Sequence, residues 1–291
     1  MPISRKKANI ATYNPIYSFI MNTLKSTFKK FIYGTIPYCF CKLFHADSPN
    51  LKYYQYIKSN GYARHLFEFK EEYEQMRFPV QEDKEKRLYY VLNKQGHRLY
   101  FKKNIPVEKI EKCYRVLAME QDLRSPHHYL DSIEEVKGKT FVDVGSAEGF
   151  TSLEVIEKAS HIYLFEQDTL WIEALNATFE PWKDKVSIIP KYVSNNNSEQ
   201  EITLDTFFQD KDKKQLFIKM DIEGAERYAL QGSKNLFENC NLQFAICTYH
   251  GNDNIVVPNI LREYGCKFTE QFGFFRHQLR SVVARGSSKS L

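Results

Sequence analysis

The sequence lacks the cysteine spacings that hold a zinc ion or a disulfide framework. Its 291 residues include six scattered cysteines, which are Cys39, Cys41, Cys113, Cys240, Cys247 and Cys266. Cys39 and Cys41 are near neighbours, but a single intervening residue is too short for the usual metal-binding pair. Cysteines that are neither paired nor dense are typical of proteins from a reducing compartment, so we expect a cytoplasmic location.

Long hydrophobic runs are also missing. The most apolar stretch, residues 31–44, is interrupted by Gly34, Pro37 and Lys42. A transmembrane helix needs about 20 consecutive apolar residues, so this stretch is too short and too broken to span a bilayer. The basic residues 5–7 are not followed by the apolar core and the cleavage site of a signal peptide. We therefore expect neither a membrane span nor a signal peptide.

Acidic residues are almost absent from the first 70 positions. This part of the chain has eleven Lys and Arg residues against Asp47 and Glu68, a net charge of +9, whereas the whole chain carries +5. The remaining residues are therefore slightly acidic. A basic, aromatic front fits either nucleic acid or an anionic membrane surface.

Residues 14–32 have the periodicity of a basic amphipathic helix. Apolar residues recur every four positions, at Ile16, Ile20, Leu24, Phe28 and Ile32, and lysines occupy polar positions between them. We expect this helix to begin after a proline and to end near a glycine, at positions 15 and 34. Two interpretations stay open: the helix packs on the rest of the protein, or it rests on a partner or on the inner face of a membrane.

Four segments are expected along the chain. Residues 1–80 form a basic, largely helical, aromatic-rich extension. A charged stretch at residues 71–86, across its boundary with the next segment, is a linker or a helix. Residues 81–137 contain a β-hairpin, at 88–92 and 99–101, followed by a helix at about 107–121. Residues 138–286 form an α/β domain, and residues 287–291 are a tail.

The α/β domain is indicated by strands and helices that alternate from Lys139 onward, which is typical of a mostly parallel sheet. The expected strands are 140–144, 161–165, 186–190, 216–220 and 242–248, and the expected helices are 149–158, 169–180, 223–231 and 254–264. Two final strands, 266–271 and 278–284, are too close together for a crossover helix. We therefore expect them to pair antiparallel.

The turn after the first of these strands lacks the G-x-G-x-x-G spacing of a dinucleotide site. Residues 143–149 read D-V-G-S-A-E-G. Tight glycine turns bring backbone N–H groups close to a nucleoside cofactor. Asp143, two residues before Gly145, favours S-adenosylmethionine, because the ammonium and sulfonium groups of that cofactor are cationic. Asp143, Gly145, Glu148 and Gly149 are predicted to bind it.

Ligands of open α/β sheets bind beyond the carboxyl ends of the strands. Glu166 and Gln167 follow the second strand, and the two oxygens of a carboxylate can accept hydrogen bonds from both ribose hydroxyls. We predict that Glu166 binds the ribose. Tyr192 and Val193 follow the third strand and either flank the adenine or belong to the core.

The stretch from Leu216 to Glu226, LFIKMDIEGAE, is the second strong signal. A buried strand delivers Lys219, Asp221 and Glu223 within five positions, and these would share one face if the strand continued. We predict that Asp221 lies near both cofactor and substrate. Glu226 falls in the first turn of a helix, where the helix dipole explains an acid without any further role.

Methyl transfer from a sulfonium is an in-line displacement, and a base helps when the acceptor is a hydroxyl. His250 follows the fifth strand and has an unperturbed pKa of about 6.5, which suits that task. Asp221 and Glu223 are competing candidates for the base. A segment leading to the first strand contributes further substrate or lid candidates, which are Ser125, His127, His128 and Tyr129.

These motifs resemble the FkbM family of S-adenosylmethionine-dependent methyltransferases. The matching pieces are D-V-G-S-A-E-G at 143–149, L-F-E at 164–166, Leu204-Asp205 and I-K-M-D-I-E-G-A-E at 218–226, of which the K-x-D-x-E-G-A-E run is the specific one. Upstream, Glu120-Gln121-Asp122 and Ser125-Pro126-His127 resemble a bacterial branch. The resemblance covers about residues 85–285 and implies a Rossmann-like class I methyltransferase fold. It assigns Asp143, Gly145, Gly149 and Glu166 to the cofactor and places Asp221 and Glu223 at the site.

The resemblance implies O-methylation of a saccharide, for example in polysaccharide biosynthesis, or of a secondary metabolite. Because no metal-binding trio is evident, we expect chemistry without a metal. Two alternatives stay open. A nucleic-acid or protein methyltransferase would use the basic front, although an N-P-P-Y-like motif is absent after the fourth strand. A non-catalytic scaffold docked on a membrane would keep only cofactor binding.

Overall fold

The computed structural model of the chain describes residues 24–61, 66–275 and 278–288. The chain divides into two compact units. The first comprises Met1–Leu66 with Phe274–Leu279, and the second comprises Phe67–Gly273 with Arg280–Leu291. Our expected boundary near residue 80 lies inside the second unit, because strand β1, Val80–Asp83, pairs with the strand that follows it.

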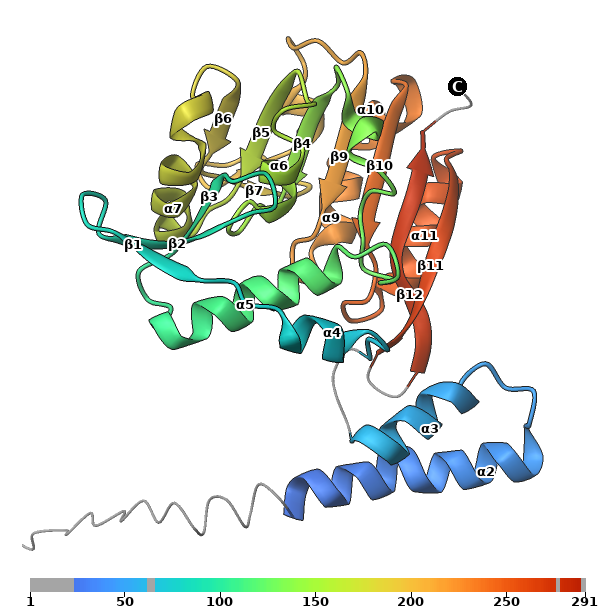
Figure 1. Cartoon of the computed structure of the whole chain (residues 1–291). Helices are drawn as coiled ribbons and strands as arrows, with labels where there is room; N and C mark the ends of the chain where they lie inside the picture. The colour runs from blue at the N-terminus through green and yellow to red at the C-terminus, as the bar shows by residue number, and fades with distance from the viewer. Residues whose placement is uncertain (1–23, 62–65, 276–277, 289–291) are drawn as a thin grey trace, which may run out of the picture. The chain divides into compact units, whose positions relative to one another are not determined.

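Residues 24–61 of the first unit are mostly helical (Figure 1), whereas its residues 274–275 and 278–279 belong to strands. Residues 24–30 are α-helical and continue into the π-helical segment η1, Phe31–Thr35, and into α2, Ile36–Phe44; α3, Leu51–Asn60, follows. The expected helix end near Gly34 is wrong. Gly34 instead permits close packing, because a Cβ there would lie 2.6 Å from the backbone N of Lys58 in α3. Residues 14–23 of the predicted helix lie outside the described residues.

The second unit begins with a small antiparallel sheet and a long helix. It contains α4, Lys70–Gln75; β1; β2, Leu88–Leu92; β3, Arg98–Phe101; α5, Val107–Glu120; and the 3-10 turn η2, Ile133–Val136. The hairpin and the helix confirm the sequence-based expectation. Strand β1 was not expected, because a charged stretch with exposed side chains has no hydrophobic alternation.

The main sheet has seven strands in the order β11-β12-β10-β9-β4-β5-β6. Their bounds are β4 Thr140–Val144, β5 His161–Phe165, β6 Val186–Ile189, β9 Leu216–Met220, β10 Leu242–Cys247, β11 Lys267–Phe275 and β12 Gln278–Ser287. The five strands from β10 to β6 run parallel, whereas β12 is antiparallel to β10 and forms the C-terminal hairpin with β11. The α/β fold with a mostly parallel sheet is confirmed.

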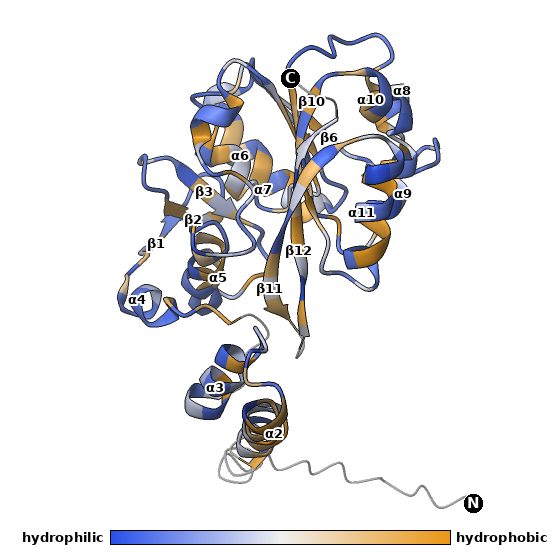
Figure 2. Ribbon diagram, turned by 90° about the vertical axis from the view of Figure 1, so that its right-hand side faces the viewer, coloured by the Kyte–Doolittle hydropathy of each residue, from blue (hydrophilic) through white to orange (hydrophobic). Residues whose placement is uncertain are grey.

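Helices cover both faces of this sheet (Figure 2). The remaining elements are α6 Phe150–Glu154, α7 Thr169–Phe179, η3 Glu180–Trp182, β7 Tyr192–Val193, β8 Glu201–Ile202, α8 Leu204–Phe207, α9 Glu226–Gln231, α10 Lys234–Asn239 and α11 Asp253–Glu263. Side chains alternate across the strands. Phe141 and Phe217 therefore join the core beneath α5, α6 and α7, whereas Val142 and Ile218 join the core beneath the helices from α8 to α11.

The last strand of the sheet extends further toward the C-terminus than expected. The predicted tail begins too early, because β12 reaches Ser287 and the hydroxyl of the fully buried Ser288 accepts a hydrogen bond from Leu242 N–H. Within residues 24–61, 66–275 and 278–288, none of the helices combines the length and the hydropathy that a bilayer-spanning segment requires.

Candidate active site

The parallel strands β5, β4 and β9 bring three loops to one edge of the sheet. Strand β4 pairs with both neighbours, so that Val144 lies beside Phe165 of β5 and Met220 of β9. The chain runs on from β4 to β5 on one side and reaches β9 on the other, which makes this a switch point of the kind where α/β folds bind ligands. Gly145 and Glu166 therefore emerge close together.

The glycine turn after β4 has a backbone that few other sequences could adopt. Gly145, Ala147 and Gly149 have φ values of 80°, 45° and 79°. A Cβ at Gly145 would lie 2.0 Å from the carbonyl oxygen of Asp221, so the turn packs directly on the loop after β9. Two successive N–H groups of the turn, those of Gly145 and Ser146, donate to the Phe165 carbonyl. The turn is thus fixed to both neighbouring strands.

Replacing Gly145 with alanine tests this packing. The added methyl group would overlap the Asp221 carbonyl and strain a positive-φ residue, so we expect a loss of about 3 kcal/mol or more in the free energy of unfolding. Chemical denaturation measures it. Gly138→Ala is the matched control, because Gly138 has φ 71° but, apart from its two chain neighbours, no described residue has an atom within 4 Å of the point that a Cβ would occupy. That control is expected to cost about 1 kcal/mol, and equal losses would contradict the packing argument.

Glu166 fastens the turn to the end of β5. One carboxylate oxygen accepts a hydrogen bond from Ala147 N–H at 2.9 Å, and the other accepts bonds from the N–H groups of Gln167 and Asp168, both at 2.8 Å. A carboxylate has about four acceptor positions, so these three bonds leave room for a ligand. The ribose contact of Glu166 stays a prediction. Gln167 adjoins the site, and its N–H supports Glu166.

Asp143 and Lys219 form a buried ion pair beneath the turn. Lys219 Nζ lies 2.8 Å from Asp143 Oδ1 and donates to the Gly145 carbonyl at 2.8 Å, while Ser152 Oγ donates to Asp143 Oδ2 at 2.6 Å. Burial disfavours the Lys219 ammonium, but the carboxylates of Asp143, Asp221 and Glu148 outweigh it and raise its pKa. Asp143, 1% exposed, orders the turn. Its contact with the cofactor ammonium stays a prediction.

Further carboxyl groups gather around this pair without a matching number of cations. Burial, with contributions from Asp143 and Asp221 against Lys219, raises the pKa of Glu148 to about 7. Burial and the charges of Asp221, Glu148 and Glu223 raise the pKa of Glu120 to about 8. Glu120 is the last residue of α5 and was absent from our predicted site residues. Its only sequence signal was the E-Q-D motif at the end of a predicted helix.

Asp221 occupies the centre of the site. The buried hydroxyl of Tyr129 donates to Asp221 Oδ2 at 2.7 Å. Asp221 Oδ1 is buried and has no hydrogen-bond partner among the residues that the structure describes. His250 Nδ1 lies 3.9 Å from it. Strand β9 ends at Met220, as expected, so the condition under which Asp221 and Glu223 would share one strand face with Lys219 is not met, and Glu223 has φ 55°.

His250 is held between carboxylates. Its Nδ1 lies 3.2 Å from Glu226 Oε1, and its Nε2 lies 3.2 Å from Oε2 of Glu223, whose side chain is 89% exposed. Burial opposes the charged imidazole, but the bond to Glu226 and the charges of Asp221 and Glu223 raise the pKa of His250. A proton on His250 hinders its action as a base, so the predicted base role requires its prior deprotonation.

Four side chains at this point could ligate a metal. Asp221, Glu226, Cys247 and His250 offer ligand atoms that lie within 4.8 Å of one another. Glu226 and Cys247 are fully buried, and neither was predicted as a site residue. Glu226 also accepts a hydrogen bond from Ile222 N–H, which orders the loop after β9. Within this cluster His250 is hydrogen-bonded to Glu226, and metal-free chemistry stays a prediction.

The segment from Ser125 to Tyr129 is buried, and only part of it reaches the site. Tyr129 contacts Asp221, and the His127 ring packs edge-on against Tyr249 at 4.9 Å. Ser125 Oγ accepts a bond from His127 N–H. His128 Nε2 lies 2.9 Å from Asp131 Oδ1 and also contacts Gln271 and Arg285 of the C-terminal hairpin. The structure gives Ser125 and His128 packing contacts, and their lid role stays a prediction.

The predicted adenine neighbours lie on a separate two-stranded ribbon. Tyr192 and Val193 form β7, which pairs with β8. Tyr192 is exposed, whereas Val193 is buried in the core beneath α8. This placement makes Tyr192 available to a ligand and gives Val193 the core role that was the alternative. Adenine contact stays a prediction for both.

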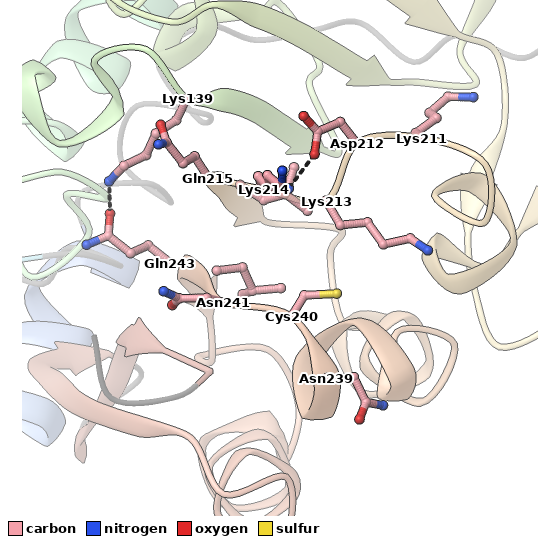
Figure 3. A pocket seen from close by; sticks show the side chains of 12 residues that line it. Lys139, Lys211, Asp212, Lys213, Lys214, Gln215, Asn239, Cys240, Asn241 and Gln243 are labelled. Atoms are coloured by element: carbon pink, nitrogen blue, oxygen red, sulfur yellow. Dashed lines mark hydrogen bonds between the residues drawn. The ribbon is translucent and has the colours of Figure 1, made fainter.

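A pocket lies at the opposite ends of the strands (Figure 3). This pocket, of about 830 Å³, is lined by the start of β9 and β10 and by four lysines, Lys139, Lys211, Lys213 and Lys214. Lys139 donates to the side chain of Gln243 across it. Ligands of α/β sheets bind beyond the carboxyl ends, so this amino-end pocket is distinct from the candidate active site.

Comparison with known proteins assigns the chain to a family. Residues 105–268 match the model of the methyltransferase FkbM domain. A search of curated proteins finds no match. Solved structures similar to this chain include three methyltransferases, each described by its identity, by the share of this chain and of the other chain that is covered, and by its TM-score. Methyltransferase FkbM from Methylobacillus flagellatus is 17% identical, with 62% of this chain and 54% of that chain covered and a TM-score of 0.42. An rRNA methylase from Streptococcus thermophilus is 13% identical, with 53% of this chain and 89% of that chain covered and a TM-score of 0.35. Magnesium protoporphyrin IX methyltransferase from Synechocystis with bound S-adenosylmethionine is 13% identical, with 52% of this chain and 71% of that chain covered and a TM-score of 0.36.

The chain spans about half the length of the Methylobacillus structure, which covers 62% of this chain in return. The family model, by contrast, covers more than half of the present sequence and includes the glycine turn, Glu166, Asp221 and His250. The sequence motifs, the sheet order and the family match agree. The chain belongs to the FkbM family of methyltransferases.

Proposed function

We propose that this protein transfers a methyl group from S-adenosylmethionine to a hydroxyl group, on a saccharide or a secondary metabolite. The observation that supports it best is the surplus of carboxyl groups at the switch point. Glu120, Glu148 and Asp221 lie there with Lys219, whose ammonium is already paired with Asp143. Such a site attracts a cationic sulfonium and ammonium and repels the pyrophosphate of a dinucleotide.

The chain's own residues would each have a defined part. The glycine turn, held by Glu166 and by the Asp143–Lys219 pair, presents its backbone to the nucleoside. Glu166 accepts hydrogen bonds from the ribose hydroxyls. The carboxyl groups of Glu120 and Glu148, when ionised, balance the positive charges of the methionine end. Bound S-adenosylmethionine supplies the electrophilic methyl group.

Transfer needs alignment and one proton acceptor. The acceptor oxygen forms a bond to the methyl carbon while the carbon–sulfur bond breaks, and its electron pair stays on sulfur, so that S-adenosylhomocysteine is released. The hydroxyl proton passes to Asp221, Glu223 or His250. Asp221 Oδ1 is a suitable acceptor for this proton, because it is a buried carboxylate oxygen that has no hydrogen-bond partner among the described residues.

The test of the reaction uses the full-length protein, methyl-labelled S-adenosylmethionine and a panel of saccharides and small hydroxylated metabolites. Label that survives mild base treatment, as an ether does, is expected in a saccharide or metabolite. Asp221→Asn should lower the rate by roughly 100-fold or more if this carboxylate takes the proton. Label transferred instead to RNA or protein, with none on the hydroxylated panel, would refute the proposal.

The charge of the site leads to a separate prediction about how cofactor affinity depends on pH. Glu148 and Glu120, with pKa values of about 7 and about 8, lose their protons as the pH rises through neutrality. Affinity for cationic S-adenosylmethionine should therefore rise relative to that for S-adenosylhomocysteine, which lacks the sulfonium, by roughly tenfold per ionised carboxyl. Calorimetry with both ligands measures the ratio. Glu120→Gln with Glu148→Gln should flatten the profile, and an unchanged slope would contradict the prediction.

A further inference from the structure

The helix at residues 24–44 carries an exposed apolar stripe. Leu24, Phe28, Phe31, Ile36, Phe40, Leu43 and Phe44 are between 48% and 76% exposed, although large apolar side chains are usually buried. They form the largest concentration of such residues in the described chain, and part of the ribbon of α2 is orange in Figure 2. Contiguous exposed apolar surface marks an interaction site.

The π-helical segment keeps the two halves of this stripe on one face. In an α-helix, spacings of three and four repeat on one side, as at Leu24, Phe28 and Phe31 and again at Ile36, Phe40 and Leu43. In a regular α-helix, the step of five residues from Phe31 to Ile36 would rotate the second half of the stripe away from the face that carries the first half. A π-turn accommodates one extra residue, and η1 spans this step. The local irregularity thus aligns all six residues.

The opposite side of the same helix is already occupied within its own unit. Lys30 Nζ donates to the Ser59 carbonyl of α3, Gly34 is buried against Ile57 and Lys58, and the ammonium of Lys58 lies 4.4 Å from the centre of the Tyr38 ring. Residues 30, 34 and 38 form a row at spacing four. Since α3 packs on this row, the stripe is the face that it leaves uncovered.

The charge of this helix identifies its partner. Between residues 24 and 44 there are four lysines, of which Lys30 bonds to α3, and there is no acidic residue before Asp47 in the sequence. A second copy of the chain would bring like charges together. An anionic lipid surface instead accepts the apolar side chains among its acyl chains and the lysines among its headgroups. We propose that residues 24–44 are a membrane-surface helix that lies flat on anionic lipid and holds the protein there.

This proposal does not depend on the methyl-transfer reaction, and its test measures no catalysis. The full-length protein is sedimented with vesicles of phosphatidylcholine alone and with vesicles containing about one third phosphatidylglycerol. Binding to the anionic vesicles is expected and should weaken as salt screens the lysines. Phe28→Glu with Phe40→Glu should leave the protein in the supernatant. Lys25→Gln with Lys42→Gln should weaken binding by roughly fivefold for each lysine.

Matched controls separate the stripe from general hydrophobicity and from misfolding. Leu123→Glu and Ile255→Glu each remove an apolar residue of similar exposure in the other unit, and they should bind vesicles as the unchanged protein does. Circular dichroism should give the same helix content for all variants. Failure of the unchanged protein to bind anionic vesicles would overturn the proposal. So would a dimer in sedimentation equilibrium that Phe28→Glu with Phe40→Glu dissociates, because the stripe would then belong to a second copy.

Discussion

Lys219→Met is expected to lower the free energy of unfolding by about 3–5 kcal/mol, because it leaves the carboxylate of Asp143 buried without its cation. Asp143 is 1% exposed, and Lys219 Nζ is its charged partner at 2.8 Å. The same substitution removes the donor that holds the Gly145 carbonyl, so the cofactor turn should loosen as well. Thermal unfolding should show a fall of roughly 6–20 °C in the midpoint.

A double variant shows whether charge is the cause. Lys219→Met with Asp143→Asn removes both charges and keeps an acceptor for Ser152, and replacing a buried pair by neutral groups is often close to neutral in stability. It should recover more than half of the loss. If the double variant is as unstable as Lys219→Met alone, the ion pair is not what stabilises this part of the sheet.

Glu166→Gln is expected to weaken binding of S-adenosylhomocysteine at least roughly 100-fold, because two hydrogen bonds to a charged acceptor are worth about 1.5–3 kcal/mol each. The amide also has one acceptor oxygen instead of two, so it cannot satisfy Ala147, Gln167 and Asp168 as the carboxylate does. Calorimetry measures the affinity. A cofactor analogue without the ribose 2′-hydroxyl should bind the unchanged protein weakly. Its affinity for the Glu166→Gln variant should be only slightly lower, because one of the hydrogen bonds to Glu166 is already missing.

Asp168→Asn is the matched control for Glu166→Gln. Asp168 is the neighbouring acid, but its oxygens cap α7 through Leu170 N–H and pair with Lys102. Asparagine is an equally good helix cap. We expect cofactor affinity to change by less than about twofold, since this single screened charge lies outside the predicted ribose contact. A large effect of Asp168→Asn, or none of Glu166→Gln, would contradict the ribose assignment.

The positions of the parallel strands along the chain were predictable because buried strands such as 140–144, 161–165 and 216–220 are continuous apolar runs between turn residues. The structure begins and ends these three strands at the residues we expected. The first helix of the domain is shorter than expected, Phe150–Glu154, since periodicity does not show where a buried helix ends.

The composition of the site was less predictable than its position. Residues that follow strands, such as Asp221 and His250, were found by the strand-end rule, whereas Glu120 arrives from α5, which precedes the sheet by twenty residues of chain. Only tertiary packing brings Glu120 and Tyr129 beside Asp221. In the same way, a local pattern suggested that Gly34 ends a helix, and only the approach of α3 explains why it does not.

The bonds that Glu166 makes to three backbone N–H groups have a consequence for how quickly and how tightly a ligand is captured. They hold the turn in shape with no ligand present, so binding needs little loss of chain entropy. Association should then approach the rate of a rigid receptor, and the heat capacity change should reflect the buried surface of the ligand alone, without a folding contribution from the protein.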